Sequence, residues 1–360
     1  MDKPELPESP ELNQPELNQD LTPGIDPGID IDKFFAANPS PINHQEPTEP
    51  TKFTGPTYCG TIGIIGRPNV GKSTLLNKIL GRKISITCRK PQTTRHHILG
   101  IKTKDNVQAI YVDTPGLHQE SANSGKAINK YMNRTARSIM FDVDILIFLI
   151  DSDKWTTEED LILSQLAQLT CPVILAINKA DLIKNKPELL PLIKNLSEKF
   201  KFTDIIPISA KHNQHLDHLE KIIQKLLPEQ AFIYPEDQLT DKSQKFLAAE
   251  VIREKLMRTL GDEIPYDLTV EIEHFKTRET HPEANLKPNL IDIAAIIYVE
   301  RETQKPILIG AHGGKLKEIG TQARIDLENL FGKKIFLRLW VKVKSGWSDD
   351  EKSLQSLGYD

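Results

Sequence analysis

The stretch Gly66-Arg-Pro-Asn-Val-Gly-Lys-Ser73 decides the fold of the longest part of this chain. It has the spacing G-x-x-x-x-G-K-S, it follows an apolar run at 61–65, and it precedes a helical pattern at 74–80. In this setting, backbone N–H groups wrap around a phosphate at a helix N-terminus. The context disfavours the competing interpretation, a purely structural glycine turn. We therefore predict that the phosphates of a nucleotide are bound by Gly66, Asn69, Gly71, Lys72, Ser73 and Thr74.

Strands and helices alternate around this motif. The apolar runs predict buried strands at 61–65, 107–112, 145–150, 173–177 and 205–207. The amphipathic stretches between them predict helices at 74–80, 127–140, 158–169, 189–200 and 216–227. This alternation predicts an α/β, doubly wound domain, in which a mostly parallel sheet is covered by helices on both faces. We place this domain at 57–228.

A second motif indicates a metal ion next to the phosphates. Asp113-Thr-Pro-Gly116 follows the run at 107–112. An Asp at the carboxyl end of a strand can hold Mg²⁺ through water, and the N–H of Gly116 can approach a γ-phosphate. Mg²⁺ would also be ligated by the hydroxyl of Ser73, while Lys72 reaches the β- and γ-phosphates.

A third motif identifies the base. Asn178-Lys-Ala-Asp181 follows the run at 173–177. A carboxylate only accepts hydrogen bonds, so Asp181 suits the N1–H and N2–H₂ donors of guanine and rejects adenine. The stem of Lys179 can lie over the base. Ser209-Ala210-Lys211, after the last strand, would direct backbone N–H groups toward the guanine O6. The nucleotide is therefore GTP or GDP.

The loop Arg89-Lys-Pro-Gln-Thr-Thr-Arg-His96 lies between the phosphate loop and Asp113. In such a loop a Thr completes the Mg²⁺ shell when GTP is bound and releases it otherwise. We favour Thr94 over Thr93. The predicted metal ligands are Ser73, Thr94 and Asp113, and the predicted catalytic residues are Lys72, Thr94 and Gly116.

Hydrolysis of GTP to GDP and phosphate is expected to be slow. Many GTPases place a water-orienting Gln directly after the Asp-x-x-Gly segment, and this chain has Leu117 there. We expect the site to rely on positioning and Mg²⁺, with RNA-induced ordering of 89–96 as one way to complete it.

The composition sets the class of protein. The chain has 360 residues, 27% charged and 38% hydrophobic, as expected for two or three globular domains. No apolar run approaches the roughly 18 to 20 residues of a membrane-spanning helix. Three widely spaced cysteines, Cys59, Cys88 and Cys171, exclude a disulfide framework. The sequence lacks a signal-peptide pattern, so we predict a cytoplasmic protein.

The ends of the chain differ from its middle. Residues 1–56 contain 11 prolines and 11 Asp or Glu against 3 Lys, which leaves a net charge of +4 for the rest. Such a segment buries too little apolar surface to offset the entropy of ordering, so we predict a disordered, acidic tail. A linker is predicted at 229–240, a second domain at 241–345 and a C-terminal tail at 346–360.

The second domain has an α+β pattern. A helix is expected at 244–260, strands at 266–275, 290–300 and 334–343, and a second long helix at 315–330 after a Gly-rich turn. The stretch 305–344 is the most basic, with 9 Lys or Arg against 3 Asp or Glu. A basic face of this kind is compatible with nucleic acid.

Together, the nucleotide motifs and Gln92-Thr-Thr-Arg-His96 resemble the Era family of bacterial GTPases. The second domain agrees with this resemblance. The stretch Ile309-Gly-Ala-His-Gly-Gly-Lys-Leu-Lys-Glu-Ile319 resembles the GxxG segment of a type II KH domain, and Trp340-Val-Lys-Val-Lys344 with Trp347 resembles the family's C-terminal region. A GxxG loop clamps about four nucleotides of single-stranded RNA. The predicted RNA-binding residues are Gly310, Ala311, His312, Gly313, Lys315, Lys317, Lys333 and Lys334.

The resemblance implies a slow GTPase that binds the 3′ end of 16S rRNA and assists assembly of the small ribosomal subunit. We also expect a monomer. The loop interior Ala311-His312 lacks the Lys or Arg that is more usual there, which predicts weaker attraction of phosphates. Related GTPases bind K⁺ through an Asn at the position of Asn69; a simple turn residue is the alternative. Other open alternatives are action on another ribosomal or tRNA substrate, a signalling switch, and peripheral attachment to the cytoplasmic face of the cell membrane.

Overall fold

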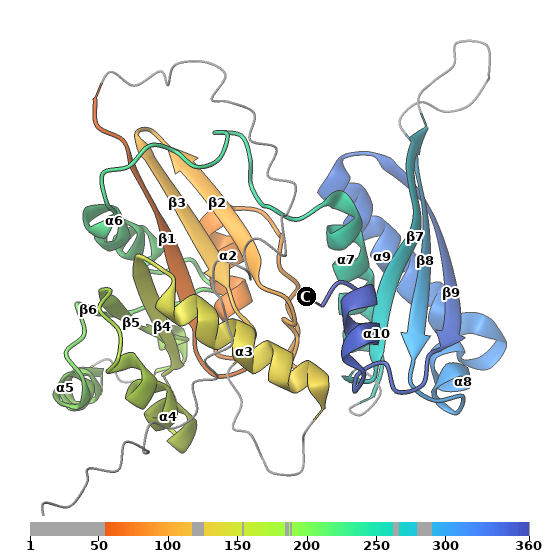
Figure 1. The fold of residues 1–360 in the computed structure, drawn as a ribbon, viewed down its shortest axis with the longest axis horizontal. Helices are drawn as coiled ribbons and strands as arrows, with labels where there is room; N and C mark the ends of the chain where they lie inside the picture. Colours follow the sequence, from red (N-terminus) through yellow and green to blue (C-terminus); the bar gives the residue numbers. More distant parts are fainter. Residues whose placement is uncertain are drawn as a thin grey trace, which may run out of the picture. The chain divides into compact units, whose positions relative to one another are not determined.

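The structure is a computed structural model that describes residues 55–116, 126–152, 155–183, 187, 189–261, 266–278 and 290–359. The tail predicted at 1–56 lies outside these residues apart from its last two positions, and Leu117 lies outside them as well. Residues 51–360 form one compact unit. Figure 1 shows that this unit contains two sheets with their helices.

The first sheet carries the nucleotide motifs. Among the described residues it has six strands in the order β2-β3-β1-β4-β5-β6. All neighbouring pairs are parallel except β2 with β3, which is antiparallel. The predicted doubly wound, mostly parallel sheet is therefore confirmed, with the edge strand β2 as an addition that the pattern did not predict. The strands are β1 (Tyr58–Ile65), β2 (Ile98–Lys104), β3 (Val107–Asp113), β4 (Ile145–Asp151), β5 (Val173–Asn178) and β6 (Asp204–Pro207).

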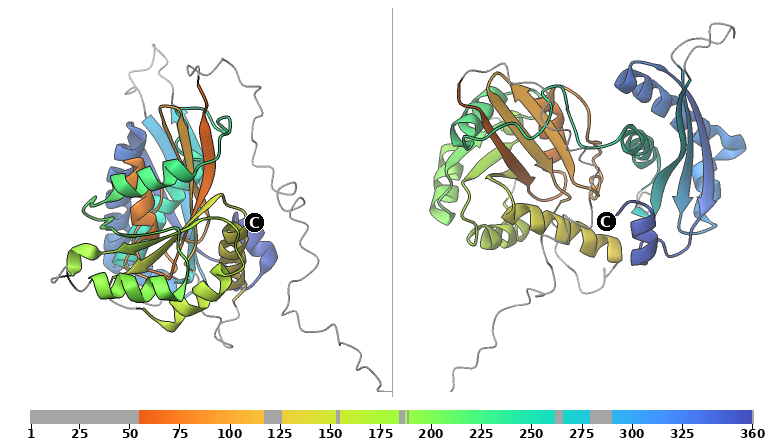
Figure 2. Two further views of the ribbon diagram at one scale, coloured as in Figure 1. Left: turned by 90° about the vertical axis from the view of Figure 1, so that its left-hand side faces the viewer. Right: turned by 45° about the horizontal axis from the view of Figure 1, so that its top comes forward.

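Helices cover both faces of this sheet, because alternate residues of each buried strand point to opposite sides. On one face, Ile62 and Ile64 of β1 share a core with α2 and α6; on the other, Ile65 shares a core with α3, α4 and α5. Figure 2 shows these layers from two further directions. The helices are α2 (Lys72–Leu80), α3 (Ala127–Phe141), α4 (Thr157–Leu166), α5 (Leu189–Lys199) and α6 (Leu216–Leu226).

The segment predicted as a linker is fixed to the first sheet. The fully buried side chain of Gln108 on β3 accepts hydrogen bonds from the backbone N–H groups of Ile233 and Tyr234, both at 2.9 Å, and donates to the carbonyl of Tyr234 at 2.8 Å. One amide side chain thus satisfies three backbone groups. The chain therefore leaves the first domain along a defined path.

The second sheet has three described strands in the order β7-β8-β9, with β7 antiparallel and β9 parallel to β8. Side chains of α7, α8 and α9 share one core with its strands, including Leu256 of α7, Leu308 of α8 and Ile319 of α9. This is the predicted α+β unit. Its elements are α7 (Gln244–Thr259), β7 (Leu268–Arg278), β8 (Leu290–Val299), α8 (Gln304–Ile309), α9 (Gly314–Phe331) and β9 (Lys334–Val343).

The segment at 346–360, predicted as a tail, holds a further helix, α10 (Glu351–Ser356). Trp347 and Tyr359 flank it and are buried in a core with Ile128, Tyr131 and Met132 of α3. The indole N–H of Trp347 also donates to the carbonyl of Asp267 at 3.3 Å. These residues therefore tie the second domain to a helix of the first.

Within the described part of the chain, no helix combines the length and apolarity needed to cross a membrane.

Candidate functional site

The phosphate loop joins β1 to α2 and can only be built with glycine at two positions. Gly66 has a φ of +152°, and a Cβ there would lie 2.2 Å from the carbonyl oxygen of Leu149. Gly71 has a φ of +106°, and its Cβ would lie 2.3 Å from the side-chain nitrogen of Asn178. Any other residue would push the loop away from β4 and β5. Asn69 is exposed, with a φ of +63° that suits the turn-residue interpretation.

Lys72 is held in place by two backbone carbonyls. Its ammonium donates to the carbonyls of Gly66 at 2.9 Å and Arg67 at 3.0 Å. Burial lowers the pKa of Lys72 to about 8, and the nearby Asp113 opposes this effect. The ammonium of Lys72 is therefore a buried positive charge at the N-terminus of α2, where it can attract phosphate oxygens.

Three oxygen-bearing side chains converge beside the lysine. The hydroxyl of Ser73 donates to the carboxylate of Asp113 at 2.7 Å and lies 2.8 Å from the hydroxyl of Thr94. Ser85, which sequence reasoning did not single out, donates to the same carboxylate oxygen at 2.8 Å. In contrast, the hydroxyl of Thr93 turns away and donates to the carbonyl of Lys90 at 2.6 Å. Of the two threonines, Thr94 is therefore the one beside Ser73.

This cluster fits a divalent cation with hard oxygen ligands. Asp113 is fully buried; burial raises the pKa of its carboxyl, while the hydrogen bond from Ser73 and the charge of Lys72 oppose this. The second carboxylate oxygen, Oδ1, is buried without a hydrogen-bond partner in the described structure. Two hydroxyls and a carboxylate with a spare oxygen are the donor set that Mg²⁺ takes together with phosphates and water.

The base-reading residues meet at the carboxyl ends of β5 and β6. Asn178 ties the two loops together: its amide donates to the carbonyl of Val70 at 2.7 Å and accepts from the N–H of Ala210 at 2.9 Å. Lys179 forms an ion pair with Asp151. A hydrogen bond from Ser209 lowers the pKa of Asp181, so this carboxylate stays ionised and accepting.

These residues line one cavity of about 960 Å³. Of the fourteen predicted nucleotide-binding residues, all but Gly66 and Asp113 contribute to its wall. Lys211 is exposed at its rim. The volume lies in the range of pockets that enclose small ligands and cofactors.

Sequence reasoning missed residues of the second domain that reach this cavity and the loop at 83–96. Arg258 of α7 lines the cavity and donates to the carbonyl of Thr87 at 2.8 Å. The buried guanidinium of Arg253 donates to the carbonyl of Thr93, next to Thr94. Arg95 in turn donates to the carbonyl of Leu268 at the start of β7 at 2.8 Å. No local signal marks such contacts, because they join residues about 170 positions apart.

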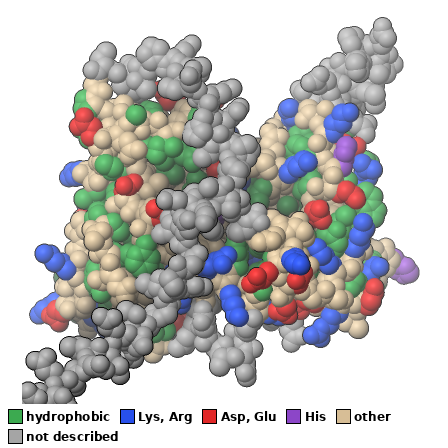
Figure 3. Space-filling model, in the orientation of Figure 1, with side chains coloured by type: hydrophobic (Ala, Val, Ile, Leu, Met, Phe, Trp, Pro, Cys, Tyr) green, Lys and Arg blue, Asp and Glu red, His purple; other side chains and the backbone are tan. Residues whose placement is uncertain are grey.

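The GxxG segment forms a tight turn between α8 and α9. Gly310 and Gly313 have φ values of +72° and +75°, and His312, between them, has +50°. Ala311 and His312 are exposed. Lys315 and Lys317 lie in the first turn of α9, beside this loop. Figure 3 shows Lys and Arg interspersed with Asp and Glu over this domain.

The structure does not bring Lys333 and Lys334 to this loop. They follow the C-terminal end of α9, an 18-residue helix, which is about 27 Å long at 1.5 Å per residue. Lys334 instead lies 3.5 Å from the carboxylate of Glu328. Lys315 and Lys317 are close to Lys333 and Lys334 in the sequence, but the length of α9 separates the two pairs in the structure.

Comparison with family models agrees with the two domains. A model described as "50S ribosome-binding GTPase" matches residues 61–179, and a model described as "KH domain" matches residues 263–348. The predicted KH domain is therefore confirmed.

The chain also resembles whole proteins over most of its length. It is 57% identical over 303 residues to GTPase Era of Glaesserella parasuis, which covers 84% of this chain and 97% of the relative. It is 54% identical over 301 residues to GTPase Era of Ectopseudomonas mendocina, with 84% and 97% covered.

Two solved structures match equally widely. A crystal structure of Era with MgGDPNP and nucleotides 1506–1542 of 16S ribosomal RNA has a TM-score of 0.79 and 39% identity, covering 84% of this chain and 99% of the other. A variant of Aquifex aeolicus Era bound to GDP and aluminium fluoride has a TM-score of 0.79 and 38% identity, with the same coverage. The chain belongs to the GTPase Era family.

Proposed function

We propose that this protein is a GTP-hydrolysing switch that binds the 3′ end of small-subunit (16S) rRNA through its KH domain and assists assembly of the small ribosomal subunit. One observation carries the proposal. A single chain combines a cavity lined by the residues predicted to bind phosphate, metal and guanine with a KH domain at 263–348, and Arg258 of α7, the helix that precedes this match, lines the cavity. The Era structure with an Mg²⁺–nucleotide complex and a 16S rRNA fragment supports this assignment.

Guanine recognition is assigned to Asp181, Lys179 and the loop at 209–211. The ionised carboxylate of Asp181 accepts two hydrogen bonds from the base, and adenine cannot supply them. The loop at 209–211 directs the backbone N–H of Lys211 toward the guanine O6, because the N–H groups of Ser209 and Ala210 already donate to Gln214 and Asn178. The bond from Ala210 to Asn178 keeps this loop beside the phosphate loop. The side chain of Lys179 covers the base.

Phosphate binding and hydrolysis rest on the groups around Lys72. Its ammonium, which donates to the carbonyls of Gly66 and Arg67, is positioned to bind phosphate oxygens, and Gly116 directs its N–H toward the γ-phosphate. Ser73, Thr94 and Asp113 would hold Mg²⁺, which would supply positive charge to the β- and γ-phosphates. Thr94 belongs to the loop held by α7, so closure of the metal site depends on contacts from the second domain.

K⁺ is proposed as a second cation, held by Asn69 beside the phosphates. The exposed position of Asn69 on the cavity wall supports this role. An extra positive charge there would stabilise the transition state as an arginine finger does. We expect faster hydrolysis in K⁺ than in Na⁺, and a loss of that difference in Asn69→Ala; equal rates in both salts would contradict the proposal.

RNA binding is assigned to the exposed turn at 310–313 and to the lysines at the start of α9. With no side chain at Gly310 and Gly313, the backbone can approach phosphates, and exposed N–H groups at the helix N-terminus favour negative charge. A monomeric state and peripheral membrane attachment remain predictions without a supporting contact.

The test measures binding of the GTP-loaded protein to a short strand that copies the 16S rRNA 3′ end, with a scrambled strand of equal composition as control. The GTPase rate is read in the same samples. We expect selective binding and a faster rate. Ala311→Asp with His312→Asp should abolish binding, whereas Gln322→Glu with Asn329→Asp, which adds equal charge on exposed α9 positions, should not.

Equal binding to both strands would refute the 16S assignment and leave the GTPase. Preference for large-subunit rRNA or tRNA would identify another substrate of the same enzyme.

A further inference from the structure

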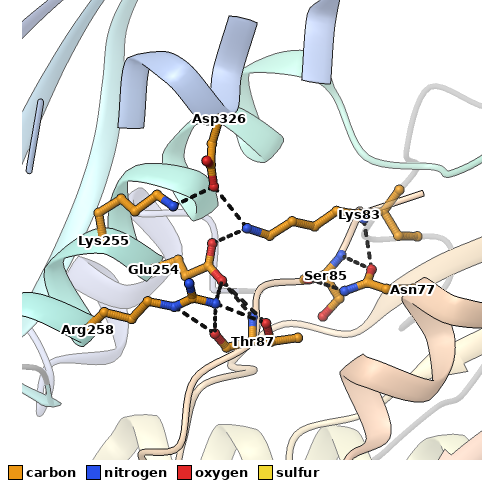
Figure 4. Close-up of polar contacts among 9 residues, drawn as sticks. Asn77, Lys83, Ser85, Thr87, Glu254, Lys255, Arg258 and Asp326 are labelled. Carbon is orange, nitrogen blue, oxygen red and sulfur yellow. Dashed lines mark hydrogen bonds and ion pairs between the residues drawn. The ribbon is translucent and has the colours of Figure 1, made fainter. Parts of the chain in front are cut away.

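A cluster of charged side chains on α7 faces the loop at 83–87 (Figure 4). Four charged residues of this helix, at positions 250 and 253–255, are buried, although their types favour solvent. Buried charges are retained only where partners satisfy them, so the partners show what this surface of α7 does.

Glu254 is the centre of the cluster. Its side chain is fully buried. The carboxylate accepts from the backbone N–H of Thr87 at 3.2 Å and from its hydroxyl at 3.4 Å. It pairs with the ammonium of Lys83 and, at 2.6 Å, with the guanidinium of Arg258. Arg258 closes the ring by donating to the carbonyl of Thr87. One carboxylate of α7 therefore contacts both ends of 83–87, Lys83 and Thr87.

This loop is bonded directly to the predicted metal-binding acid. Ser85 lies in its middle and donates to the carboxylate of Asp113 at 2.8 Å. Asn77 of α2 clamps the same loop, donating to the carbonyl of Ser85 at 2.7 Å and accepting from its N–H at 3.0 Å. The position of the Ser85 hydroxyl thus depends on α2, which begins at the phosphate loop, and on the anchor at Glu254.

The cluster also reaches the RNA-binding helix. Asp326 of α9 lies 3.1 Å from the ammonium of Lys83 and pairs with Lys255. Lys83 bridges Glu254 on α7 and Asp326 on α9, as Figure 4 shows. α9 begins directly after the GxxG turn. A continuous set of bonded groups therefore runs from Asp113 to the helix that carries Lys315.

We propose that Glu254 is a positioning residue that couples the nucleotide site to the RNA-binding helix by holding the loop at 83–87. The proposal rests on the proposed function, because RNA is the second ligand. If metal-bound GTP fixes Asp113 and Ser85 in one arrangement, it also fixes Thr87 and Lys83, and through them α7 and α9. Linkage requires RNA to favour that arrangement of the nucleotide site by the same factor.

The test variant is Glu254→Gln. The amide can still accept from Thr87, but it removes the charge that pairs with Lys83 and Arg258. We measure the dissociation constant of the 16S strand with a non-hydrolysable GTP analogue and with GDP, and take their ratio. We expect a clear nucleotide dependence in the wild type and a ratio reduced about 2- to 30-fold in the variant, the range seen for residues along coupled networks.

The matched control is Glu220→Gln. This residue pairs with Lys102 at 2.7 Å within the first domain and has no contact with the cluster. The ratio should be unchanged. A second variant, Lys83→Met, removes a side chain that is 38% exposed and should fold even if Glu254→Gln does not. Because both act through one ion pair, the double variant should lose little more coupling than either alone.

A readout without RNA tests the positioning role itself. In the nucleotide-bound protein, hydrogen exchange at the amides of 84–87 should accelerate in Glu254→Gln and stay slow in Glu220→Gln. An unchanged affinity ratio, or a wild type that binds RNA equally in both nucleotide states, overturns the proposed coupling. If the wild type fails to bind the strand, the proposed function is refuted instead. Hydrogen exchange at the amides of 84–87 then tests the positioning role of Glu254 by itself. Faster exchange in Glu254→Gln supports this role, and exchange at the wild-type rate refutes it.

Discussion

The contact between Arg253 and Thr93 offers a way to separate stability from nucleotide binding. The guanidinium of Arg253 is buried and grips the carboxylate of Glu250 through two bonds, at 2.6 and 2.7 Å. It also donates to the carbonyl of Thr93 and, at 3.3 Å, to the sulfur of Met257. That peptide immediately precedes Thr94, whose hydroxyl lies beside Ser73. Arg253→Met removes the ion pair and the loop contact together.

Loss of the ion pair with Glu250 and loss of the bond to Thr93 should have effects of different size, and a second substitution can reverse the first effect without the second. Leaving the buried Glu250 carboxylate without its partner costs about 3–5 kcal/mol of unfolding free energy. The double variant Glu250→Gln with Arg253→Met removes both charges and should recover most of this stability, because neutral replacements of buried pairs are often tolerated. The hydrogen bond to the carbonyl of Thr93 is absent from the single variant and from the double variant. A charged donor contributes about 1.5–3 kcal/mol, or roughly 10- to 150-fold in affinity.

The assay combines thermal unfolding with calorimetric titration of a GTP analogue and of GDP, both with Mg²⁺. We expect Arg253→Met to unfold at a clearly lower temperature and the double variant near the wild type, while both bind the GTP analogue more weakly relative to GDP. Lys245→Met, at an exposed position of the same helix, is the charge-matched control. A double variant with wild-type preference for the GTP analogue would refute the idea that α7 positions Thr94.

Three further predictions concern single groups. Asp181→Asn should weaken GTP binding by about 10²–10⁴-fold. The variant should instead favour xanthosine triphosphate, because the base of that nucleotide has a carbonyl acceptor where guanine has an amino donor, and this carbonyl faces the new amide donor. A competition titration measures the preference, and a retained preference for GTP would contradict the prediction. The pKa of Lys72 is lowered from 10.5 to about 8. As the pH rises from about 8 to 10.5, the folded protein loses this ammonium charge, and GTP affinity should fall by up to about tenfold per pH unit. The stability of the nucleotide-free protein should rise over the same range, because the unfolded chain then binds more protons than the folded one. Calorimetry in buffers of different ionisation enthalpy should then show proton uptake on binding, and Lys72→Arg should give a flat profile. His312→Lys should strengthen RNA binding and steepen its salt slope by about one; an unchanged slope would show that this position does not meet a phosphate.

Local motifs predicted residues that come together around one cavity, because the spacing of each motif sets its geometry. The phosphate loop, Asp113 and Asn178 follow buried strands, and parallel strands end at one edge of a sheet. Residues far apart in the sequence therefore meet at positions that the strand order determines. The sequence favoured Thr94 over Thr93, and the hydroxyl positions agree with this preference, because the hydroxyl of Thr94 lies beside Ser73 and that of Thr93 bonds to Lys90.

Residues whose role depends on contact with the other domain could not be predicted from local motifs. The helix at 244–260 was expected from its pattern, but a pattern of residue types does not show that Glu254 and Arg253 are buried against another domain. The strand β2 escaped notice because it is an edge strand that ends in Lys102-Thr-Lys104 and pairs antiparallel. Trp347 looked like part of an exposed tail because its partners lie on α3.

The packing of Trp347 and Tyr359 on α3 has a consequence for how the protein is made. The apolar patch at Ile128, Tyr131 and Met132 is covered by residues that follow the entire second domain. At about 5–20 residues per second of synthesis, the patch stays bare for on the order of 10 to 40 s on a translating ribosome. During that time the nascent first domain can fold its sheet, yet it exposes an apolar surface to which holding chaperones can bind. A messenger truncated just before position 347 would leave that surface bare permanently, so damaged transcripts should yield an aggregation-prone product that quality control removes.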